Sequence, residues 1–584
     1  MKRNKLRAGA AIAAIALLGS MGMGGVAYAS PDNEPDIHIA GAEDESADIA
    51  LIKKDAQARL SIHKYLGTPV EAKNDGMPQD IENRVRLQNV KFDVYMVNGV
   101  NLTTNEGWKA AQNLHECKVS VSDVLQSAIV CKDKSFGISK AGSGLTNSFG
   151  AAKIDKLPVG LYLVVEDLAG SKDIKGEGKT YKPEQITGIN PFLVTLPMTN
   201  PDSRDSWMYD VHVYPKNQAA EITKEVLDGN QGEENQDGYK IGQNITYRLE
   251  STINVVDSNQ DGTVDGQDLG YYYVKDQLSN NVQHVSSTLT IVPPRGNPVV
   301  VLNANDDYIF AIDKSNRIGF SLTESGLNKL AQAAGGKLRT DIVAKVSSVP
   351  ADGQIKNRAS FYPNNYPWTS RGLTPPKPGD TPPNSPPNTP PDVPSNEVVS
   401  KYGDIIINKV NADGKSLKGA EFAVYRATFE SYAAGYTCKG VNFQADPIAR
   451  TANATDDNGL AMIQGLQLSD WRNDSHEESG LIENEKEYYS YCLVETKSPD
   501  GYQLLAEPIE FDLTHEGAIT DLKELVGKAL KPGQGLKVIN QPDNLKNKLP
   551  LTGGQGIALI SGLGVVLVGG GVGYYVYSNR RKNA

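Results

Sequence analysis

A lysine and a glutamate occupy corresponding positions in two regions of the chain that repeat each other. The first region has Lys64 in IHKY and Glu166 in LYLVVED, and the last has Lys409 in INKV and Glu495 in YCLVETKSPDGY. In both regions the lysine faces inward near an early strand and the glutamate lies in a late strand. Buried charges of this kind need a chemical reason, because they lose their hydration.

The expected reason is a reaction between the lysine and an asparagine. Burial lowers the pKa of a lysine and raises that of a carboxyl group, so a shared proton leaves a neutral, nucleophilic amine. The protonated acid then polarises an amide carbonyl. With an asparagine side chain as the amide, the product is a Lys–Asn isopeptide bond and free ammonia. The reaction needs no enzyme.

A different lysine ends the stretch WMYDVHVYPKN, from Trp207 to Asn217. Its alternating valines predict a half-buried strand, and Pro215 is expected to end the pairing of that strand. Lys216 would then display its amine at a rigid strand end. The alternative is an ordinary surface lysine.

A third candidate site is DSNQDGTVDGQDL, from Asp257 to Leu269, which has the spacing of an EF-hand-like calcium loop. Gly262 would make the sharp turn, and Asp265 could add a ligand through water. The predicted calcium ligands are Asp257, Asn259, Asp261, the carbonyl of Thr263, and Asp268. A solvated acidic turn is the alternative.

The elements that must position these residues are mostly strands. Short alternating runs such as ITYRLESTI, DIIINKV and AEFAVY are separated by Gly, Asn, Asp and Pro, which predicts an all-β chain of antiparallel sandwiches. One helical insertion is expected at 326–335. The proline-rich run 375–394 predicts an extended spacer that builds no sheet, with a ligand for proline-binding modules as the alternative.

Both ends of the chain carry targeting segments. A basic start, an apolar run and Ala27-Tyr28-Ala29 predict a signal peptide over 1–29. The uncharged apolar run 556–577 predicts a membrane helix, and the basic residues after it predict a cytoplasmic tail. The region between them is therefore expected outside the membrane.

Composition excludes some functions and limits others. The 584 residues carry a net charge of -11, which argues against nucleic acid as a partner. The four cysteines permit three pairings. Cys117 with Cys131 and Cys438 with Cys492 are favoured, since each pair falls within one predicted domain; a metal cluster is disfavoured because no close-spaced Cys/His set is present. HExxH, GxSxG and P-loop motifs are absent from the sequence, so nothing recommends an enzyme.

YCLVETKSPDGY resembles the E-box of collagen-adhesin type B domains in Gram-positive surface proteins. That resemblance implies Lys409 as nucleophile, Glu495 as catalyst and Asn540 in LKVINQP as acceptor. Ser498 stands where the family more often has alanine.

The region after EITKEV resembles the related type A domains. It implies Lys224 as nucleophile, Asp276 as acid catalyst, placed by its context alone, and Asn357 as acceptor. In the first domain Asn217 is a candidate acceptor for Lys64, with Glu166 as catalyst, and an ordinary Lys64 salt bridge is the alternative.

Five residues before the apolar run resemble a sortase sorting signal: Leu549, Pro550, Leu551, Thr552 and Gly553. In that family a sortase cysteine cleaves after the threonine and holds its carboxyl group as a thioester until an amine accepts it. A pilin motif resembling WxxxVxVYPKN accompanies it, at Trp207, Val211, Val213, Tyr214, Pro215, Lys216 and Asn217.

Together these features resemble a sortase-assembled shaft pilin, similar to actinobacterial fimbrial major subunits. Lys216 would join Thr552 of the next copy in a wall-attached surface fimbria made from a membrane-anchored precursor. Implied partners are identical subunits, pilin-specific and housekeeping sortases, minor or tip pilins, and a host glycan or protein that the sequence does not identify. A wall-anchored adhesin or tip subunit that is not polymerised, and a wall-anchored enzyme, are the competing functions.

The resemblance implies tandem immunoglobulin-like domains of the collagen-adhesin types A and B. The expected division is a signal peptide 1–29, a sandwich 30–217, a type A domain 218–373, a linker 374–396, a type B domain 397–545, the sorting motif 549–553, a membrane helix 556–577 and a basic tail 578–584.

Overall fold

The computed structural model describes residues 51–67, 75–79, 81, 83–227, 240–294, 297–363, 377–380, 392–472, 480–515 and 535–544. The predicted signal peptide, sorting motif, membrane segment and basic tail lie outside these residues. Within the described ranges, no helix is both long enough and apolar enough to cross a bilayer.

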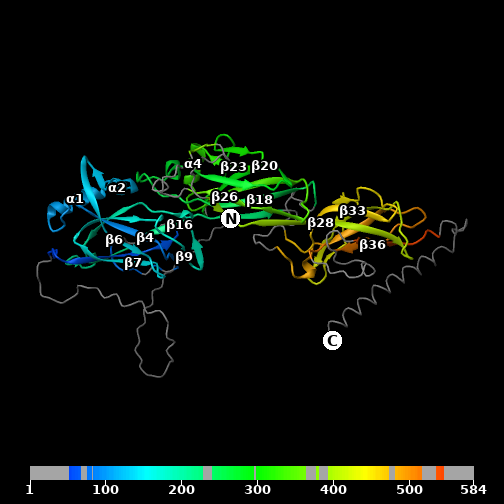
Figure 1. Ribbon diagram of the computed structural model, residues 1–584, viewed down its shortest axis with the longest axis horizontal. Coiled ribbons are helices and arrows are strands. Elements are labelled where there is room, and N and C mark those ends of the chain that lie inside the picture. The colour runs from blue at the N-terminus through cyan, green and yellow to red at the C-terminus, as the bar shows by residue number, and fades with distance from the viewer. Residues whose placement is uncertain are drawn as a thin grey trace, which may run out of the picture. The chain divides into compact units, whose positions relative to one another are not determined.

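The first part of the chain forms three larger sheets, drawn in blue and cyan in Figure 1. Their strand orders are β15-β1-β7, β11-β16-β2-β3 and β12-β8-β4-β6-β5. The strands are β1 (Gln57–His63), β2 (Tyr65–Leu66), β3 (Val85–Arg86), β4 (Lys91–Val97), β5 (Ala128–Cys131), β6 (Lys134–Leu145), β7 (Ala151–Pro158), β8 (Gly160–Glu166), β11 (Ile186–Thr187), β12 (Phe192–Leu196), β15 (Asp210–Val213) and β16 (Lys216–Ala219). Two small hairpins pair β9 (Ile174–Gly176) with β10 (Lys179–Tyr181) and β13 (Met198–Thr199) with β14 (Trp207–Met208).

The middle part consists of two five-stranded antiparallel sheets. One has the order β17-β18-β24-β20-β21 and the other β22-β23-β19-β26-β27, and a single apolar core draws on both, as expected for a sandwich. Their strands are β17 (Ile222–Leu227), β18 (Asn244–Thr252), β19 (Tyr273–Gln277), β20 (Val282–Val292), β21 (Val300–Val301), β22 (Tyr308–Ile312), β23 (Arg317–Leu322), β24 (Lys337–Val346), β26 (Ala359–Tyr362) and β27 (Val393–Pro394).

The last part repeats the two-sheet plan around the long strand β28 (Val398–Asn411). β28 pairs with β25 (Gln354–Asn357), β33 (Leu460–Gln467) and, in parallel, β36 (Gly535–Asn540). The second sheet has the order β32-β29-β34-β35. Its strands are β29 (Glu421–Arg426), β32 (Ala449–Arg450), β34 (Tyr491–Lys497) and β35 (Ile509–Phe511). The all-β sandwich prediction is confirmed.

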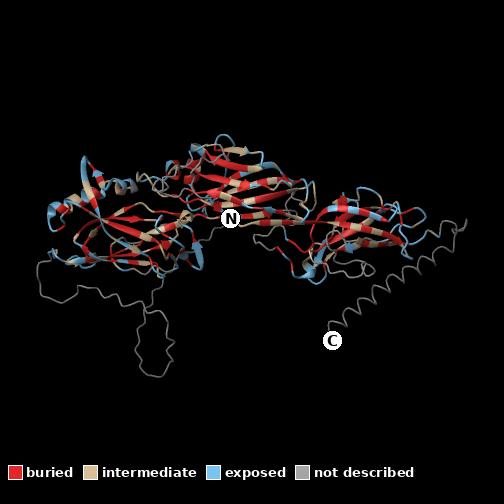
Figure 2. Ribbon diagram, viewed as in Figure 1, coloured by how far each residue is buried: buried red, intermediate tan, exposed pale blue. Residues whose placement is uncertain are grey.

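Alternation along the strands sends the reactive residues inward. In β28, Ile405, Ile407 and Lys409 are all fully buried, so the lysine takes the next place in an apolar series. Lys224 likewise follows Ile222 in β17, and Lys64 follows Ile62 just past β1. Figure 2 shows buried residues mainly in the strands, several of which alternate between buried and exposed residues along their length.

The described residues also form four α-helices and two 3-10 turns, which lie between the strands in the sequence. They are α1 (Asn105–His115), α2 (Val121–Gln126), α3 (Gly266–Leu269), α4 (Glu324–Ala331), η1 (Pro183–Gln185) and η4 (Glu485–Glu487). The predicted insertion at 326–335 corresponds to α4, which starts earlier because the Thr323 hydroxyl accepts the Gly326 N–H. The helices α1 and α2 were not predicted.

The end of the proline-rich run differs from a free spacer. Val393 and Pro394 form β27, which pairs with Phe361 and Ser360 of β26. The prediction that the run builds no sheet is therefore wrong at its C-terminal end. Proline is tolerated there because β27 is an edge strand, where one missing donor breaks no second ladder.

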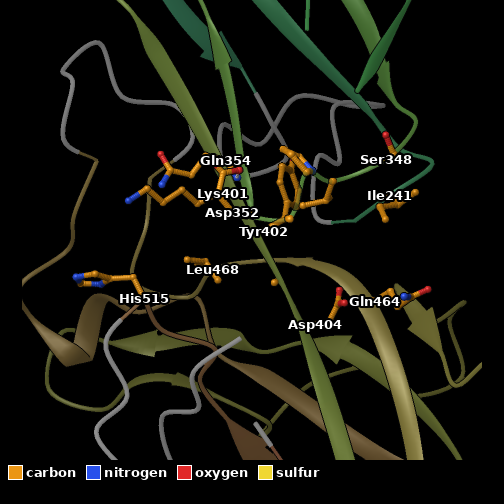
Figure 3. Close-up of a pocket in the computed structure, with 15 residues that line it drawn as sticks. Ile241, Ser348, Asp352, Gln354, Lys401, Tyr402, Asp404, Gln464, Leu468 and His515 are labelled. Atoms are coloured by element: carbon orange, nitrogen blue, oxygen red, sulfur yellow. Dashed lines mark hydrogen bonds between the residues drawn. The ribbon is translucent and has the colours of Figure 1, made fainter. Parts of the chain in front are cut away.

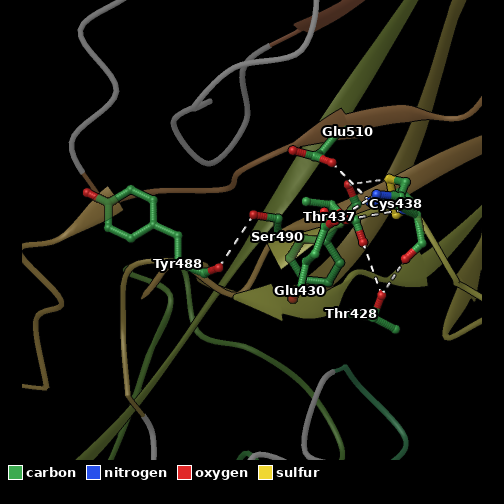
Figure 4. Close-up of a disulfide and its surroundings, with 10 residues drawn as sticks. Thr428, Glu430, Thr437, Cys438, Tyr488, Ser490 and Glu510 are labelled. Atoms are coloured by element: carbon green, nitrogen blue, oxygen red, sulfur yellow. Dashed lines mark hydrogen bonds and ion pairs between the residues drawn. A yellow bond between two sulfur atoms is a disulfide. The ribbon is translucent and has the colours of Figure 1, made fainter. Parts of the chain in front are cut away.

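Both predicted disulfides are confirmed. Cys117 bonds Cys131 and Cys438 bonds Cys492, with Cα–Cα separations of 5.8 and 5.7 Å. The second bond anchors the hairpin of β30 (Thr428–Ser431) and β31 (Gly435–Thr437) to β34, and the Glu510 carboxylate accepts the Cys438 N–H at 3.0 Å (Figure 4).

Candidate functional site

The last domain brings its three predicted residues into mutual contact. Lys409 Nζ lies 3.0 Å from Glu495 Oε1 and also contacts Asn540 Oδ1. The Asn540 amide donates to both Glu495 oxygens at 2.9 Å and to the Gln503 carbonyl at 2.8 Å. The amine thus touches the side-chain carbonyl it would attack, while the glutamate holds the amide nitrogen that would leave.

The first domain repeats the lysine–acid pair and the acid–amide contact from different strands, but Asn217 Oδ1 has no hydrogen-bond partner among the described residues, so the Lys64 amine does not bond it. Lys64 Nζ lies 2.9 Å from Glu166 Oε1, and the Asn217 amide donates to the two Glu166 oxygens at 3.0 and 3.2 Å. The Ile189 N–H also donates to Glu166 Oε2 at 3.1 Å. All three side chains are buried.

The middle domain gathers the same residue types differently. Lys224 Nζ bonds Asp276 Oδ2, and the carboxyl group lies near Asn357, but neither polar atom of the Asn357 amide has a hydrogen-bond partner among the described residues. The Lys224 amine lies 4.5 Å from the centre of the Tyr247 ring. All four side chains are at most 2% exposed.

Burial sets the protonation of these groups. Desolvation lowers the pKa of Lys409 to about 8, although Glu495 raises it. It also lowers the pKa of Lys64 and of Lys224 against the opposing effect of their carboxyl partners. Burial raises the pKa of Asp276, while Lys224 lowers it. Each shift moves its group toward the neutral form that the isopeptide reaction needs.

The pilin motif takes in β14, β15 and the start of β16, so it forms parts of three strands instead of one. Strand β15 pairs with β1, and after Pro215 a new strand, β16, begins at Lys216 and pairs in parallel with β2. Strand β15 ends at Val213, before Pro215, as predicted, but the expectation that the proline forbids further pairing is wrong because pairing resumes at Lys216 with another strand. The Pro215 carbonyl still accepts the Tyr65 N–H at 3.2 Å.

The aromatic residues of the motif are packed on the same domain. Trp207 lies 5.3 Å from Trp108 between ring centres, and Tyr214 stacks on His63 at 4.9 Å. The Tyr214 hydroxyl accepts the Gln79 N–H at 2.5 Å, while Val211 is fully buried and Val213 half-buried. These contacts fix the backbone that carries Lys216.

Lys216 itself is half-buried, so its side chain keeps a route to solvent. Burial, with a smaller contribution from the Arg84 guanidinium, lowers the pKa of its amine. Asn217, the next residue, faces the opposite way into the Glu166 site. One short strand therefore carries both an outward amine and an inward amide.

The predicted calcium loop folds around its own backbone. The carboxylate and amide oxygens of Asp257, Asn259 and Asp261 accept loop N–H groups at 2.8–3.1 Å, and Gly262 has a φ of +87°. Asp268 Oδ1 accepts the N–H groups of Ser258 and Asn259. The chemistry of this oxygen donor set and its turn fit calcium. Among the described residues no metal-holding cluster of three His, Cys, Asp or Glu side chains was found.

A cavity of about 690 Å³ is lined by residues from 241–354 and 401–515 (Figure 3). Its polar side chains have structural partners: Asp404 accepts the Gly465 N–H at 2.8 Å, Asp352 accepts the Gln354 N–H at 3.2 Å, and the His515 ring contacts Asp470 at 2.5 Å. These contacts show that Asp404, Asp352 and His515 hold neighbouring segments of the cavity wall together.

Two residues near the sites were missed from the sequence. Tyr247 stands in the alternating run ITYRLE, where an inward tyrosine signals a hydroxyl group in need of a partner. Arg84 lies in a segment without strand periodicity, so no sequence signal connects it with Lys216.

Two family models match the chain. Residues 55–218 match the Gram-positive pilin subunit D1, N-terminal domain, and residues 403–524 match a prealbumin-like fold domain. The first match ends at the pilin motif, and the second includes Lys409 and Glu495.

Named relatives match nearly the whole chain. Fimbrial subunit type 2 of Actinomyces naeslundii is 30% identical over 567 residues, covering 93% of this chain and 94% of the relative. Fimbrial subunit type 1 of Actinomyces viscosus is 30% identical over 562 residues, covering 91% and 92%.

Solved structures share the fold. The full-length major pilin SpaD of Corynebacterium diphtheriae has a TM-score of 0.53 at 24% identity, covering 84% of this chain and 98% of that one. The fimbrial protein FimP of Actinomyces oris has a TM-score of 0.51 at 25% identity, covering 85% and 100%. Because the chain is 30% identical to both Actinomyces subunits over more than 90% of its length, it belongs to the family of Gram-positive fimbrial subunits, the pilins of cell-surface pili.

Proposed function

We propose that this fimbrial shaft subunit is polymerised by a sortase that joins the Thr552 carboxyl group of one copy to the Lys216 amine of the next. The observation that carries the proposal is the position of Lys216. It opens β16 two residues after the packed Tyr214, it is half-buried rather than enclosed, and its amine has a lowered pKa. Such an amine reaches solvent from a fixed backbone and is more often neutral than an exposed lysine.

The joining reaction is an acyl transfer. The sortase cysteine cleaves the Thr552–Gly553 bond and holds the threonine carbonyl as a thioester. The Lys216 amine attacks that carbonyl, its proton passes to the departing thiolate, and an amide links the two subunits. Housekeeping sortase attachment to the wall, and minor or tip pilins at the fibre ends, complete the proposed assembly.

Replacing Lys216 tests the linkage. We expect Lys216→Ala to abolish the high-mass ladder in blots of cell-wall extracts, leaving monomer at the surface. Lys175→Ala is the matched control, because Lys175 is an exposed lysine on β9 of the same domain. A ladder that persists without Lys216 would instead support the alternative, a wall-anchored adhesin or tip subunit that is not polymerised through this residue.

We also propose internal isopeptide bonds between Lys64 and Asn217, Lys224 and Asn357, and Lys409 and Asn540. Glu166, Asp276 and Glu495 serve as the acids. The contacts within the last site support its bond most directly, and the repeated lysine–acid and acid–amide contacts support the first. The intact mass of the soluble chain should be short by one ammonia for each bond. If Lys64 and Glu166 form only a salt bridge, the peptides that contain Lys64 and Asn217 should separate after proteolysis instead of remaining cross-linked.

The loop Asp257 to Asp268 is proposed to hold calcium through Asp257, Asn259, Asp261, the Thr263 carbonyl and Asp268. Bound calcium would screen the carboxylates and stiffen the loop. Calorimetric titration with calcium should give a binding heat that Asp257→Asn/Asp261→Asn removes. Asp313→Asn is the control, since Asp313 accepts N–H groups in a comparable turn. Absence of a binding heat in the unmodified chain contradicts the site.

The predicted division of the chain is retained as part of the proposal, with domains at 30–217, 218–373 and 397–545. The sheets do not divide at the second boundary, because β25 of the middle range pairs with β28 of the last range. The segment 374–396 then joins the last two domains, with its end paired to the middle one.

A further inference from the structure

We propose that Tyr247 is a positioning residue for the middle-domain bond: its hydroxyl group donates to the side-chain carbonyl of Asn357 while Lys224 attacks that carbonyl. The inference rests on the proposed Lys224–Asn357 bond and adds a residue that the other two sites lack.

The three sites in this one chain differ in what holds the asparagine. In the first and last domains a glutamate binds the amide through both oxygens. In the middle domain the acid is Asp276, whose side chain is one methylene shorter and whose Oδ2 contacts Lys224. Its Oδ1 and both polar atoms of Asn357 have no hydrogen-bond partner in the part of the chain that the structure describes.

The aromatic side chain beside each lysine differs in the same way. Lys64 lies 5.6 Å from the Phe92 ring centre and Lys409 lies 5.5 Å from that of Phe422. Lys224 lies 4.5 Å from the Tyr247 ring centre, so among the three sites, in the part of the chain that the structure describes, the lysine–ring contact with a phenol belongs to the site with an aspartate. The Tyr247 hydroxyl group thus occurs at the site whose acid is the shorter aspartate, which does not bind the asparagine amide as the two glutamates do.

The position of Tyr247 suits a donor to the amide. Tyr247 pairs with Val226 in the β17–β18 ladder, and the alternation that turns Lys224 inward turns Tyr247 to the same face. Burial and the Asp276 charge raise the pKa of Tyr247, while the adjacent Asn357 amide lowers it. The phenol therefore stays protonated, and its hydroxyl group and the Asn357 amide are buried in the same core without hydrogen-bond partners among the described residues.

Unpaired polar atoms in this core favour the reaction. A buried donor or acceptor without a partner destabilises the fold because its lost hydration is not replaced, and Tyr247 Oη, Asp276 Oδ1 and the Asn357 amide all lack a partner among the described residues. A small movement that lets Tyr247 donate to Asn357 Oδ1 removes part of that destabilisation and polarises the carbonyl. The donor then stabilises the oxygen as negative charge develops on it.

The step balances without a further reagent. The neutral Lys224 amine attacks Asn357 Cγ, and the carbonyl electrons move onto Oδ1, which accepts the Tyr247 hydroxyl. Asp276 carries one proton from Nζ to the amide nitrogen. The C–N bond then breaks, ammonia leaves, the carbonyl re-forms, and Tyr247 and Asp276 end in the protonation states in which they began.

Replacing Tyr247 by phenylalanine tests the role in the full-length ectodomain. We expect Tyr247→Phe to slow formation of the Lys224–Asn357 cross-linked peptide by about 100-fold as newly synthesised chain folds for the first time, followed by mass spectrometry. The Lys64–Asn217 and Lys409–Asn540 peptides serve as internal references and should form at the unmodified rate.

Tyr272→Phe is the matched control. Tyr272 is equally buried in the same domain, and its hydroxyl bonds Ser251 and the Thr252 carbonyl, away from Asn357. Its loss should leave the cross-linking rate unchanged. Substitution of 4-fluorophenylalanine at 247 fills the hydroxyl's volume without a donor, so slow cross-linking there as well excludes a packing defect.

The outcomes separate this inference from the proposed bond. If Tyr247→Phe or the fluorinated variant cross-links as fast as the unmodified chain, the Tyr247 role is overturned while the bond stands. If the unmodified chain contains no Lys224–Asn357 peptide, the bond itself is refuted and the inference with it.

Discussion

At the scale of single residues, the three buried lysines are placed where an ion pair would stabilise little. Taking two charges out of water costs several kcal/mol per ion, which their mutual attraction repays only with very good geometry. Lys409, Glu495 and Asn540 are each at most 5% exposed. A bond that converts the amine into an amide removes the charge permanently, which gives the burial a chemical purpose.

The unbonded last domain should show the cost of burying Lys409. Burial lowers the pKa of Lys409 from its ordinary 10.5 to about 8 in the folded chain, and we expect an Asn540→Ala variant, which cannot form the bond, to keep this lowering. Between these values the unfolded chain binds more protons, so stability rises with pH from about 8 to about 10.5, by ~3 kcal/mol. This gain is lost as the pH falls through the folded pKa. Urea unfolding of the last domain across this pH range measures it.

The matched control for that titration is Lys409→Met/Asn540→Ala, which keeps the shape of the side chain and removes the titrating group. Its stability should not show the rise that the single variant shows. Equal pH profiles for the two variants would contradict a depressed Lys409 pKa.

Residue identities were predictable where strand alternation and a motif agree. Lys409 and Glu495 follow from an inward lysine in INKV and the E-box resemblance, and the structure brings them together with Asn540. Asp276 was placed by its context alone and does lie against Lys224. Tyr247 was not predicted, because a strand pattern gives the inward face but not which distant polar group the hydroxyl meets.

At the scale of secondary structure, the acceptor strands in two domains run parallel to the nucleophile strands. In the last domain, β28 and β36 place Asn411 opposite Asn540, and in the first, β16 pairs with β2 next to Lys64. Hydrogen bonds between parallel terminal strands are loaded in shear when the chain ends are pulled. A covalent link across each pair would prevent that separation.

The Cys438–Cys492 disulfide should stabilise the second sheet of the last domain. It closes a segment of sequence separation 54, for which loop closure predicts ~4 kcal/mol, against ~3 kcal/mol for the separation of 14 at Cys117–Cys131. We expect Cys438→Ala/Cys492→Ala to speed amide exchange in β29, β34 and the β30–β31 hairpin. The Cys117→Ala/Cys131→Ala pair, which should leave those amides unchanged, is the control. Unchanged exchange in the first variant would contradict the anchoring role.

Element types were predictable in part. Period-two alternation predicted the long strands correctly, because each buries one face. The helices α1 and α2 were missed because they sit as short excursions in a β-rich region and are defined by local caps, such as the Thr104 hydroxyl accepting the Gly107 N–H. The proline content of the run did not predict that Val393 and Pro394 form β27, the edge strand beside β26.

At the scale of the whole molecule, each described domain combines an apolar core with one Lys–acid–Asn site. The proposed intersubunit lysine and the first internal acceptor are consecutive residues, Lys216 and Asn217. Tension passing through Lys216 would therefore enter β16, whose next residue, Asn217, is the one proposed to be bonded to Lys64. The fibre joint and the domain's internal tie would form one continuous covalent path.

Tandem mass spectrometry of native fibres tests the central claim most directly. The account predicts a peptide in which the Thr552 carboxyl group is joined to the Lys216 amine, together with internal peptides that have each lost one ammonia. Fibres in which Lys216 occurs only as a free amine, or in which Thr552 is joined to another lysine, would contradict it.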